Sequence, residues 1–357
     1  MRPAERALSP HVDDGTPFAR RTFVVAELSA NHNHDLERAK ATIDAIATTG
    51  ADAVKFQTYR PDSLTLDLST GHFAPRTEGL WKGWRPHDLY REGALPYEWH
   101  EALFAHVRQH RMIPFSAPFD LEGLELLEHL GCPMYKVASL EITHLPLIEG
   151  IAATGKPIVL STGAATLADM EEALDTIGRE RRDVTILKCT TAYPTPYAEV
   201  NLRSMNALAT AFGTAVGLSD HTLGHAVAVA AVALGASMIE KHVTLDRSAG
   251  GIDAEFSMEP HEFKAMVAAI RVVDEALGDG SYRLSLSSQS ARKRTRSIFV
   301  AEHISTGQHL TPSNVRVVRP AAGLHPRYLA RVLQARAACD LKPGTPLAWH
   351  HVDEAGA

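Results

Sequence analysis

The stretch FVVAELSANHNHD, residues 23–35, decides the fold prediction. It starts with a near-continuous apolar run that reaches Glu27, as expected of a strand that is covered on both faces. Seven more short apolar segments follow along the chain, nearly all ending in a polar or ionisable residue, and helix-like stretches separate most of them. The eight segments span residues 23–28, 53–57, 112–115, 134–138, 157–160, 184–189, 215–218 and 238–242.

The alternation of strand and helix predicts parallel pairing, because parallel neighbours need a crossover connection. Eight such units favour an α/β fold of the closed (β/α)8 type, the TIM barrel, which carries its chemistry at the carboxyl ends of the strands. The main alternative is an open doubly wound sheet, which more often has a glycine-rich phosphate loop directly after its first strand. Here that position reads ELSANHNHD, without a glycine, so we predict the barrel.

The chain is longer than a barrel needs. Its 357 residues exceed a typical barrel by roughly a hundred. Helical spacing of apolar residues predicts a helix over 261–277, and a stretch rich in Gly, Ser and Arg follows it. Short β-like pieces punctuated by glycine and proline then predict a small, mostly β domain. We expect a flexible leader at 1–21, the barrel at 22–280, a linker at 281–295 and the C-terminal domain at 296–357.

Composition argues against several classes of protein. The formal net charge of −6 disfavours a general polyanion binder, although residues 291–342 hold ten Lys or Arg against two Asp or Glu. Such a basic module can bind nucleic acid or can face an anionic substrate. No apolar run approaches the length of a transmembrane helix, and the N-terminus lacks the apolar part of a secretory signal. Cys132, Cys189 and Cys339 are few and widely spaced, which suggests reduced thiols in a cytoplasmic protein.

A long connection, residues 59–98, separates the second and third predicted strands. It contains several prolines and carries Trp81, Trp84, Tyr90 and Tyr97. We expect it to project from the catalytic rim, where a long loop is a candidate for substrate selection. The alternative is a packed cover over the barrel helices.

Two histidines and a glutamate are candidates for a metal site and its chemistry. His221 and His242 end the seventh and eighth segments, which are neighbours in the predicted barrel, so both imidazoles can point at one ion. Neutral imidazole suits Mn, Fe, Co, Ni or Zn, and Glu27 or Asp253 can help to hold the ion or its water. Glu27 can also act as a general base. The alternatives are two unrelated hydrogen-bonded histidines and a structural salt bridge between Glu27 and Lys55.

Two lysines predict an anion site. Lys55 and Lys136 end the second and fourth segments, and hydroxyl groups follow at Ser139 and Ser161. Lysines at strand ends can bind phosphate or carboxylate, or one of them can form a Schiff base. Two lysines with nearby hydroxyls favour an anion cradle over a single imine-forming lysine. The alternative is that both side chains merely extend along the barrel rim.

Beyond these groups, the sequence resembles a known family along most of its length, from about residue 22 to 353. The motifs that carry the resemblance are AELSANHNHD (26–35), GADAVKFQTY (50–59), YKVAS (135–139), KPIVLSTG (156–163), LKCTTAYPTP (187–196), VGLSDHTLGHAVAVAAVALGA (216–236), IEKHVTLD (239–246), RSIFVAEHISTGQHL (296–310) and VRVVRPAAGLHPRY (315–328). Together they resemble the sialic acid synthase family, whose members condense phosphoenolpyruvate with an N-acylated amino sugar to give a nine-carbon 2-keto acid.

The resemblance implies an architecture and partners. It implies a TIM barrel followed by a small antifreeze-like (SAF) domain, and a domain-swapped homodimer in which each SAF domain covers the partner's active site. The basic C-terminal module would then serve the anionic substrate, with neither nucleic acid nor membrane as a partner. The resemblance also implies a divalent metal, most simply Mn(II), with Mg or Co as alternatives.

Within the family, three stretches resemble the branch that makes pseudaminic acid: AELSANH, GLWKGWRPHDLYREGALPYEWH (79–100) and RPAAGLHPRY. The expected acceptor is then 2,4-diacetamido-2,4,6-trideoxy-L-altrose, and the acceptors of the sialic and legionaminic acid branches are the alternatives. One departure is Thr191, which stands in CTTAYP where sialic acid synthases tend to read CTNIYP. Because of this difference, the sugar contacts of sialic acid synthases are a weaker guide to the sugar contacts of this chain.

The family pattern also implies a role for each candidate residue. Glu27 matches the catalytic carboxylate, and His221 and His242 match the metal-binding histidines. The residues that match phosphoenolpyruvate-binding positions are Lys55, Lys136, Ser139 and Ser161. Those that match positions on the sugar side are Gln57, Tyr193 and Asp253, together with Arg319, which the family pattern places in the partner subunit's site.

The expected reaction joins C3 of phosphoenolpyruvate to the metal-polarised aldehyde carbon of the open-chain sugar. Water activated by Glu27 then adds to C2, and phosphate leaves with breakage of the C–O bond. Two other classes of protein are the alternatives. A Schiff-base aldolase on the same barrel would use Lys136 or Lys55 covalently. A non-catalytic carbohydrate-binding or nucleic-acid-binding protein would need neither Glu27 nor both histidines, yet all three are present.

Overall fold

The computed structural model describes residues 21–179, 181 and 183–354. The chain divides into two compact units between Asp279 and Gly280, and each unit is described by itself. The leader expected at 1–21 falls almost wholly outside the described residues.

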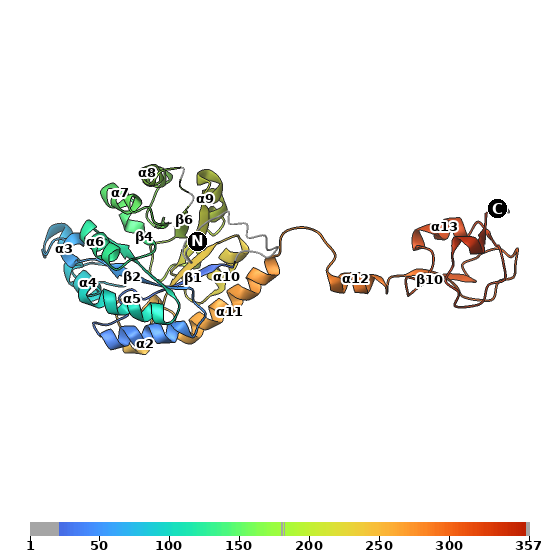
Figure 1. Cartoon of the computed structure of the whole chain (residues 1–357), viewed down its shortest axis with the longest axis horizontal. Coiled ribbons are helices and arrows are strands. Elements are labelled where there is room, and N and C mark those ends of the chain that lie inside the picture. Colours follow the sequence, from blue (N-terminus) through green and yellow to red (C-terminus); the bar gives the residue numbers. More distant parts are fainter. Residues whose placement is uncertain (1–20, 180, 182, 355–357) are drawn as a thin grey trace. The chain divides into compact units, whose positions relative to one another are not determined.

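The first unit is a closed barrel of eight parallel strands in sequence order (Figure 1). Each strand pairs with the next, and β8 closes the barrel against β1. The predicted TIM barrel is therefore confirmed. The strands are β1 (Phe23–Glu27), β2 (Ala53–Thr58), β3 (Ile113–Pro118), β4 (Tyr135–Val137), β5 (Ile158–Ser161), β6 (Val184–Cys189), β7 (Ala215–Asp220) and β8 (Met238–His242).

Helices cover the outside of the barrel, as Figure 1 shows for α2, α5 and α11. Local sequence fixes where several of them begin. The Asp35 side chain accepts hydrogen bonds from two backbone N–H groups at the start of α2, and Thr166 forms a capping box with Asp169 at the start of α8. The helices of this layer are α2 (Leu36–Ala47), α5 (His100–Gln109), α6 (Leu121–His129), α7 (Leu145–Ala153), α8 (Leu167–Ile177), α9 (Ser204–Phe212), α10 (Ala226–Ala233) and α11 (Pro260–Leu277).

The register of the strands places ionisable residues side by side at the carboxyl ends. In β1, Glu27 lies level with Lys55 of β2 on one side and with His242 of β8 on the other. The rest of β1 is apolar and buried, which is why the segment reads as a continuous apolar run. Closure of the barrel thus brings residues from the two ends of the unit's sequence to one place.

The connection between β2 and β3 contains short helices. They are α3 (Pro61–Leu64), α4 (Pro86–Gly93) and 3-10 turns at Gly71–Phe73 and Tyr97–Trp99. Proline stands at the first position of both α3 and α4. A backbone N–H at this position has no partner within the helix, so proline, which lacks one, costs no hydrogen bond there.

The second unit has its own small core, formed by residues such as Ile298, Leu310 and Leu347. In it β9 (Ser297–Val300) pairs antiparallel with β10 (Val315–Val318), and β11 (Arg336–Ala337) pairs with β12 (Val352–Asp353). Two short helices accompany these strands, α12 (Leu286–Arg292) and α13 (Leu329–Val332). Within the part of the chain that the structure describes, no helix is long and apolar enough to cross a membrane.

Candidate active site

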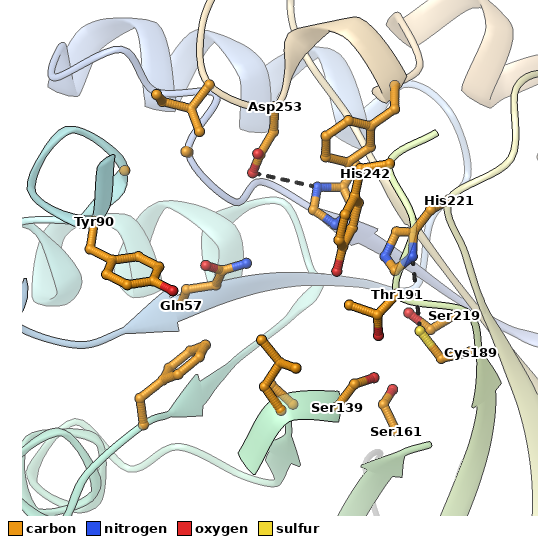
Figure 2. A pocket seen from close by; sticks show the side chains of 18 of the residues that line it. Gln57, Tyr90, Ser139, Ser161, Cys189, Thr191, Ser219, His221, His242 and Asp253 are labelled. Atoms are coloured by element: carbon orange, nitrogen blue, oxygen red, sulfur yellow. Dashed lines mark hydrogen bonds and ion pairs between the residues drawn. The ribbon is translucent and has the colours of Figure 1, made fainter. Parts of the chain in front are cut away.

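The strand ends line one cavity of about 340 Å³ at the carboxyl end of the barrel. Nine residues expected from the sequence lie in its wall, and Figure 2 shows several of them converging there. They are Lys55, Gln57, Lys136, Ser139, Ser161, Tyr193, His221, His242 and Asp253. Glu27 is fully buried beside them, with a carboxylate oxygen 3.0 Å from the Lys55 Nζ. Arg319 belongs to the second unit, where it directly follows β10.

Four buried charges of alternating sign run along the base of the cavity. Lys55 Nζ lies 3.0 Å from Glu27 Oε2 and 3.4 Å from Glu240 Oε1. Lys136 Nζ lies 3.7 Å from the same Glu240 oxygen. Glu240 thus joins the two lysines, a role that the sequence did not predict. The sequence does contain one indication that Glu240 faces the cavity: it lies two residues before His242, and alternate residues of a strand face the same side.

The pKa of the Glu27 carboxyl group is suited to proton transfer near neutral pH. Burial raises its pKa to about 7; Lys55 opposes this shift and the charge of Glu240 adds to it. Gln57 donates a hydrogen bond of 3.1 Å to the other Glu27 oxygen. The ion pair with Lys55 that was considered as an alternative is present. It is compatible with a role as base, because it orients a carboxyl group whose pKa suits proton exchange.

The lysines and serines form a polar pocket suited to an anion. Burial lowers the pKa of Lys136, whereas for Lys55 the carboxylates of Glu240 and Glu27 outweigh burial and raise the pKa. The Ser161 hydroxyl is buried and has no hydrogen-bond partner within the described residues. A buried hydroxyl without a partner is costly unless a ligand satisfies it.

The two histidines fit a divalent metal ion. Their ring centroids are 5.3 Å apart. His221 Nδ1 lies 3.1 Å from the Thr190 carbonyl oxygen, which leaves its Nε2 for a ligand. His242 Nδ1 is buried, has no hydrogen-bond partner among the described residues and lies 3.9 Å from an Asp253 oxygen. Burial and the neighbouring His221 hold the pKa of His242 well below its usual value, so this ring is neutral, as a metal ligand must be.

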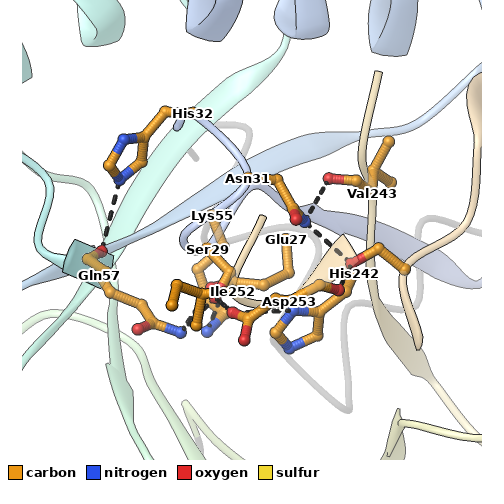
Figure 3. A network of polar contacts seen from close by, with 12 residues as sticks. Glu27, Ser29, Asn31, His32, Lys55, Gln57, His242, Val243, Ile252 and Asp253 are labelled. Atoms are coloured by element: carbon orange, nitrogen blue, oxygen red, sulfur yellow. Dashed lines mark hydrogen bonds and ion pairs between the residues drawn. The ribbon is translucent and has the colours of Figure 1, made fainter. Parts of the chain in front are cut away.

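A network of hydrogen bonds supports the part of the cavity wall that contains Gln57 and Asp253 (Figure 3). Gln57 donates to Ser29 Oγ at 2.9 Å, and Ser29 donates to Asp253 at 2.5 Å. Asn31 donates to the Val243 carbonyl oxygen at 2.9 Å and so ties the turn after β1 to the turn after β8. The residues of the ELSANH motif therefore hold Gln57 and Asp253 in position.

Cys189, which was expected from the sequence only to be a reduced thiol, also lines the cavity. Its Sγ lies 3.9 Å from His221 Nδ1. Burial raises the pKa of the thiol, but His221 and hydrogen bonds outweigh this and lower it to about 7. Its only signal in the sequence was its place at the end of the sixth segment.

The connection between β2 and β3 supplies part of the cavity wall. Trp81 donates a hydrogen bond of 3.0 Å from Nε1 to the Ile252 carbonyl oxygen, and its ring centroid lies 5.4 Å from that of Tyr193. The Arg76 guanidinium lies 5.4 Å from the Trp81 ring centroid. Tyr90 lines the end of the cavity away from Cys189 and His221, as Figure 2 shows. The sequence located this connection at the rim but not the residues that reach the cavity.

Comparison with known proteins matches both units. The NeuB family matches residues 42–282, and the SAF domain matches residues 295–353. A pseudaminic acid synthase of Helicobacter pylori is 43% identical over 92% of this chain and 97% of its own length. An N,N'-diacetyllegionaminic acid synthase of Campylobacter jejuni is 39% identical over 85% of this chain and 92% of its own. The crystal structure of an N-acetylneuraminic acid synthetase from Leptospira borgpetersenii superposes with a TM-score of 0.69 at 29% identity, covering 76% of this chain and 90% of that one.

Proposed function

The chain belongs to the NeuB family, and from this membership and the geometry of the cavity we propose that it condenses phosphoenolpyruvate with 2,4-diacetamido-2,4,6-trideoxy-L-altrose and water to give pseudaminic acid and phosphate. The observation that carries the reaction is the convergence of Glu27, two buried lysines and two histidines on one cavity. The acceptor is supported by pseudaminic acid synthases that are 40–43% identical to this chain. The legionaminic acid precursor is the alternative acceptor, because a legionaminic acid synthase is 39% identical.

In this proposal, the base of the cavity binds phosphoenolpyruvate. Lys55 and Lys136 face the phosphate and carboxylate groups, and the hydroxyls of Ser139 and Ser161 complete the anion site. Glu240 keeps the two lysines in place before the substrate arrives. The two lysines therefore do not have to be brought together when the substrate binds.

His221 and His242 would hold the divalent ion, for which we propose Mn(II), and this ion would supply Lewis-acid polarisation of the sugar aldehyde. C3 of phosphoenolpyruvate forms a bond to the aldehyde carbon with the electrons of its C=C double bond, which leaves C2 electron-deficient. The aldehyde oxygen becomes a hydroxyl by taking up a proton, which is balanced by the proton that the attacking water gives up. Glu27 accepts a proton from the water that adds to C2, consistent with its pKa of about 7. The resulting tetrahedral carbon expels phosphate, so the C–O bond breaks and the P–O bond stays intact.

The outer end of the cavity is suited to the deoxygenated, acylated part of the acceptor. Tyr59, Leu89, Tyr90 and Phe119 line it with rings and methyl groups. The apolar surfaces of this wall can pack against methyl and acetyl groups, and its two tyrosine hydroxyls can hydrogen-bond to the acetamido groups.

The proposal includes a homodimer in which Arg319 of the SAF domain completes the neighbouring subunit's site. Mixing two inactive variants, Glu27→Gln and Arg319→Ala, tests it. A hybrid dimer would contain one site with both native residues, so unfolding and refolding the mixture should restore up to about a quarter of the native activity. No recovery would mean that Arg319 does not act in the partner's site.

The three free cysteines support a cytoplasmic location, where thiols stay reduced.

The central experiment is phosphate release from phosphoenolpyruvate with Mn(II), with the altrose derivative, the legionaminic acid precursor and N-acetylmannosamine offered in separate reactions. Turnover of the altrose sugar alone is the expected result. Turnover of another sugar would move the chain to another branch, and no turnover would overturn the assignment of the cavity. In water labelled with oxygen-18, label in the released phosphate would contradict C–O cleavage. Borohydride trapping with pyruvate would detect a Schiff base.

A further inference from the structure

Away from the cavity, a second group of metal-ligating side chains lies on the outer helices. It consists of Asp44 on α2, His106 on α5, and His110, the residue that caps the C-terminus of α5. Asp44 Oδ1 lies 2.7 Å from the Nε2 atom of each histidine. The three ligand atoms all lie within 4.8 Å of one another.

The helices themselves bring these groups together. His106 and His110 are four residues apart, a spacing that puts two side chains on the same face of a helix. Asp44 comes from α2, which packs against α5. Both imidazoles already point one nitrogen at a common oxygen. Around a tetrahedral ion with ligand distances of about 2.0–2.2 Å, the ligand atoms lie about 3.3–3.6 Å apart, so each nitrogen would have to move away from the oxygen by roughly 0.6–0.9 Å.

The chemistry of the donors selects the class of ion. Two imidazoles and one carboxylate form a donor set that zinc accepts, with a fourth position open to water. Imidazole favours Zn²⁺, Cu²⁺ and Ni²⁺ over Mg²⁺ and Ca²⁺, which prefer oxygen ligands. The side chains of Asp44, His106 and His110 are 54%, 21% and 33% exposed, so an ion can reach them directly from solvent.

The position of the group separates it from the catalytic residues. Asp44 lies in the last turn of α2, and His106 lies in the last turn of α5. Barrel helices run antiparallel to the strands, so these helix ends lie toward the amino-terminal face, opposite the cavity. Each of the two helices leads into the next barrel strand, β2 or β3. A bond between their ends would hold adjacent parts of the barrel together.

We propose that Asp44, His106 and His110 form a second metal site, for Zn²⁺ or a similar imidazole-preferring divalent ion, which joins α2 to α5 and stabilises the barrel without entering the reaction. The inference does not depend on the identity of the acceptor sugar.

Counting bound zinc tests the site directly. The full chain, stripped with a chelator and dialysed against Zn²⁺, should bind one zinc ion per chain more than the double variant His106→Gln/His110→Gln. Glutamine can still donate a hydrogen bond to Asp44, so the variant should keep its fold. The matched control is His129→Gln, which removes a surface histidine that contacts the Glu125 carbonyl oxygen. Equal zinc content in the double variant and the native chain would overturn the proposal, and so would an equal loss in the control.

Two further measurements separate a bound stabilising ion from weak surface uptake. Zn²⁺ should raise the midpoint of thermal unfolding by a few degrees more in the native chain than in the double variant. Asp44→Asn should weaken zinc binding by about tenfold, because the carboxylate charge is lost. Turnover with Mn(II) should be the same in the double variant and the native chain. An equal rise of the unfolding midpoint in the two proteins would contradict the proposed role, and so would a loss of turnover in the double variant.

Discussion

In the inner half of the cavity, charges buried at neighbouring strand ends alternate in sign from Glu27 to Lys136. In the outer half, aromatic and aliphatic groups from the β2–β3 connection and the turn after β8 meet around Trp81. The inner half is built from barrel strands whose positions are tied by backbone pairing, whereas the outer half depends on a long connection. The strands can therefore carry chemistry that is common to a family, while the connection can set the choice of acceptor.

The largest expected effect tests the inner half. Glu27→Gln should lower kcat roughly 10³-fold, because the amide cannot accept the proton of the attacking water. Phosphate release under saturating substrates measures it. The KM for phosphoenolpyruvate should change little, and near-native activity would remove Glu27 from the mechanism.

A second substitution tests the anion site. Lys136→Met should raise the KM for phosphoenolpyruvate about thirtyfold, corresponding to about 2 kcal/mol for one charge-assisted hydrogen bond. Lys188→Met is the matched control, because the Lys188 ammonium contacts the Cys189 carbonyl oxygen and lies outside the cavity lining. Initial rates over a range of phosphoenolpyruvate concentrations provide the comparison. Equal effects of the two substitutions would assign the loss to general disturbance of the barrel.

The pH profile tests the state of Glu27. Its pKa of about 7 lies above the ordinary value, so the carboxyl group is protonated below that pH and cannot act as a base. We expect kcat/KM to fall by about tenfold for each pH unit below about 7 and to level off above it. The same measurement on Glu27→Gln should show no such limb. A limb that persists in that variant would belong to another group.

The smallest effect sharpens the contrast with the outer half. Trp81→Phe removes the hydrogen bond to the Ile252 carbonyl oxygen and should raise the KM for the sugar about fivefold, while the KM for phosphoenolpyruvate stays unchanged. Trp84→Phe, at a partly exposed tryptophan outside this cavity's lining, serves as the control. Equal shifts in both KM values would mean that the two halves do not act separately.

The sequence alone was sufficient to predict the barrel, because eight apolar segments separated by helix-like stretches leave few ways to pair strands. It also located Glu27, Lys55 and the two histidines, since polar residues at the ends of buried strands stand out against an apolar background. The domain boundaries and the roles of these residues remain predictions. Local pattern did not identify Glu240 as a link between the lysines, because that contact joins β8 to β2 and β4 through space.

The set of side chains at the strand ends follows from the sequence alone, since strand periodicity and apolar runs are local properties. Which of these side chains form ion pairs depends on the tertiary structure. Closure of β8 against β1 puts Glu27 level with His242, and burial raises the pKa of that carboxyl group. The hydrogen bond from Trp81 to the Ile252 carbonyl oxygen likewise depends on the tertiary structure, because it joins residues 171 positions apart and forms only when the whole connection folds.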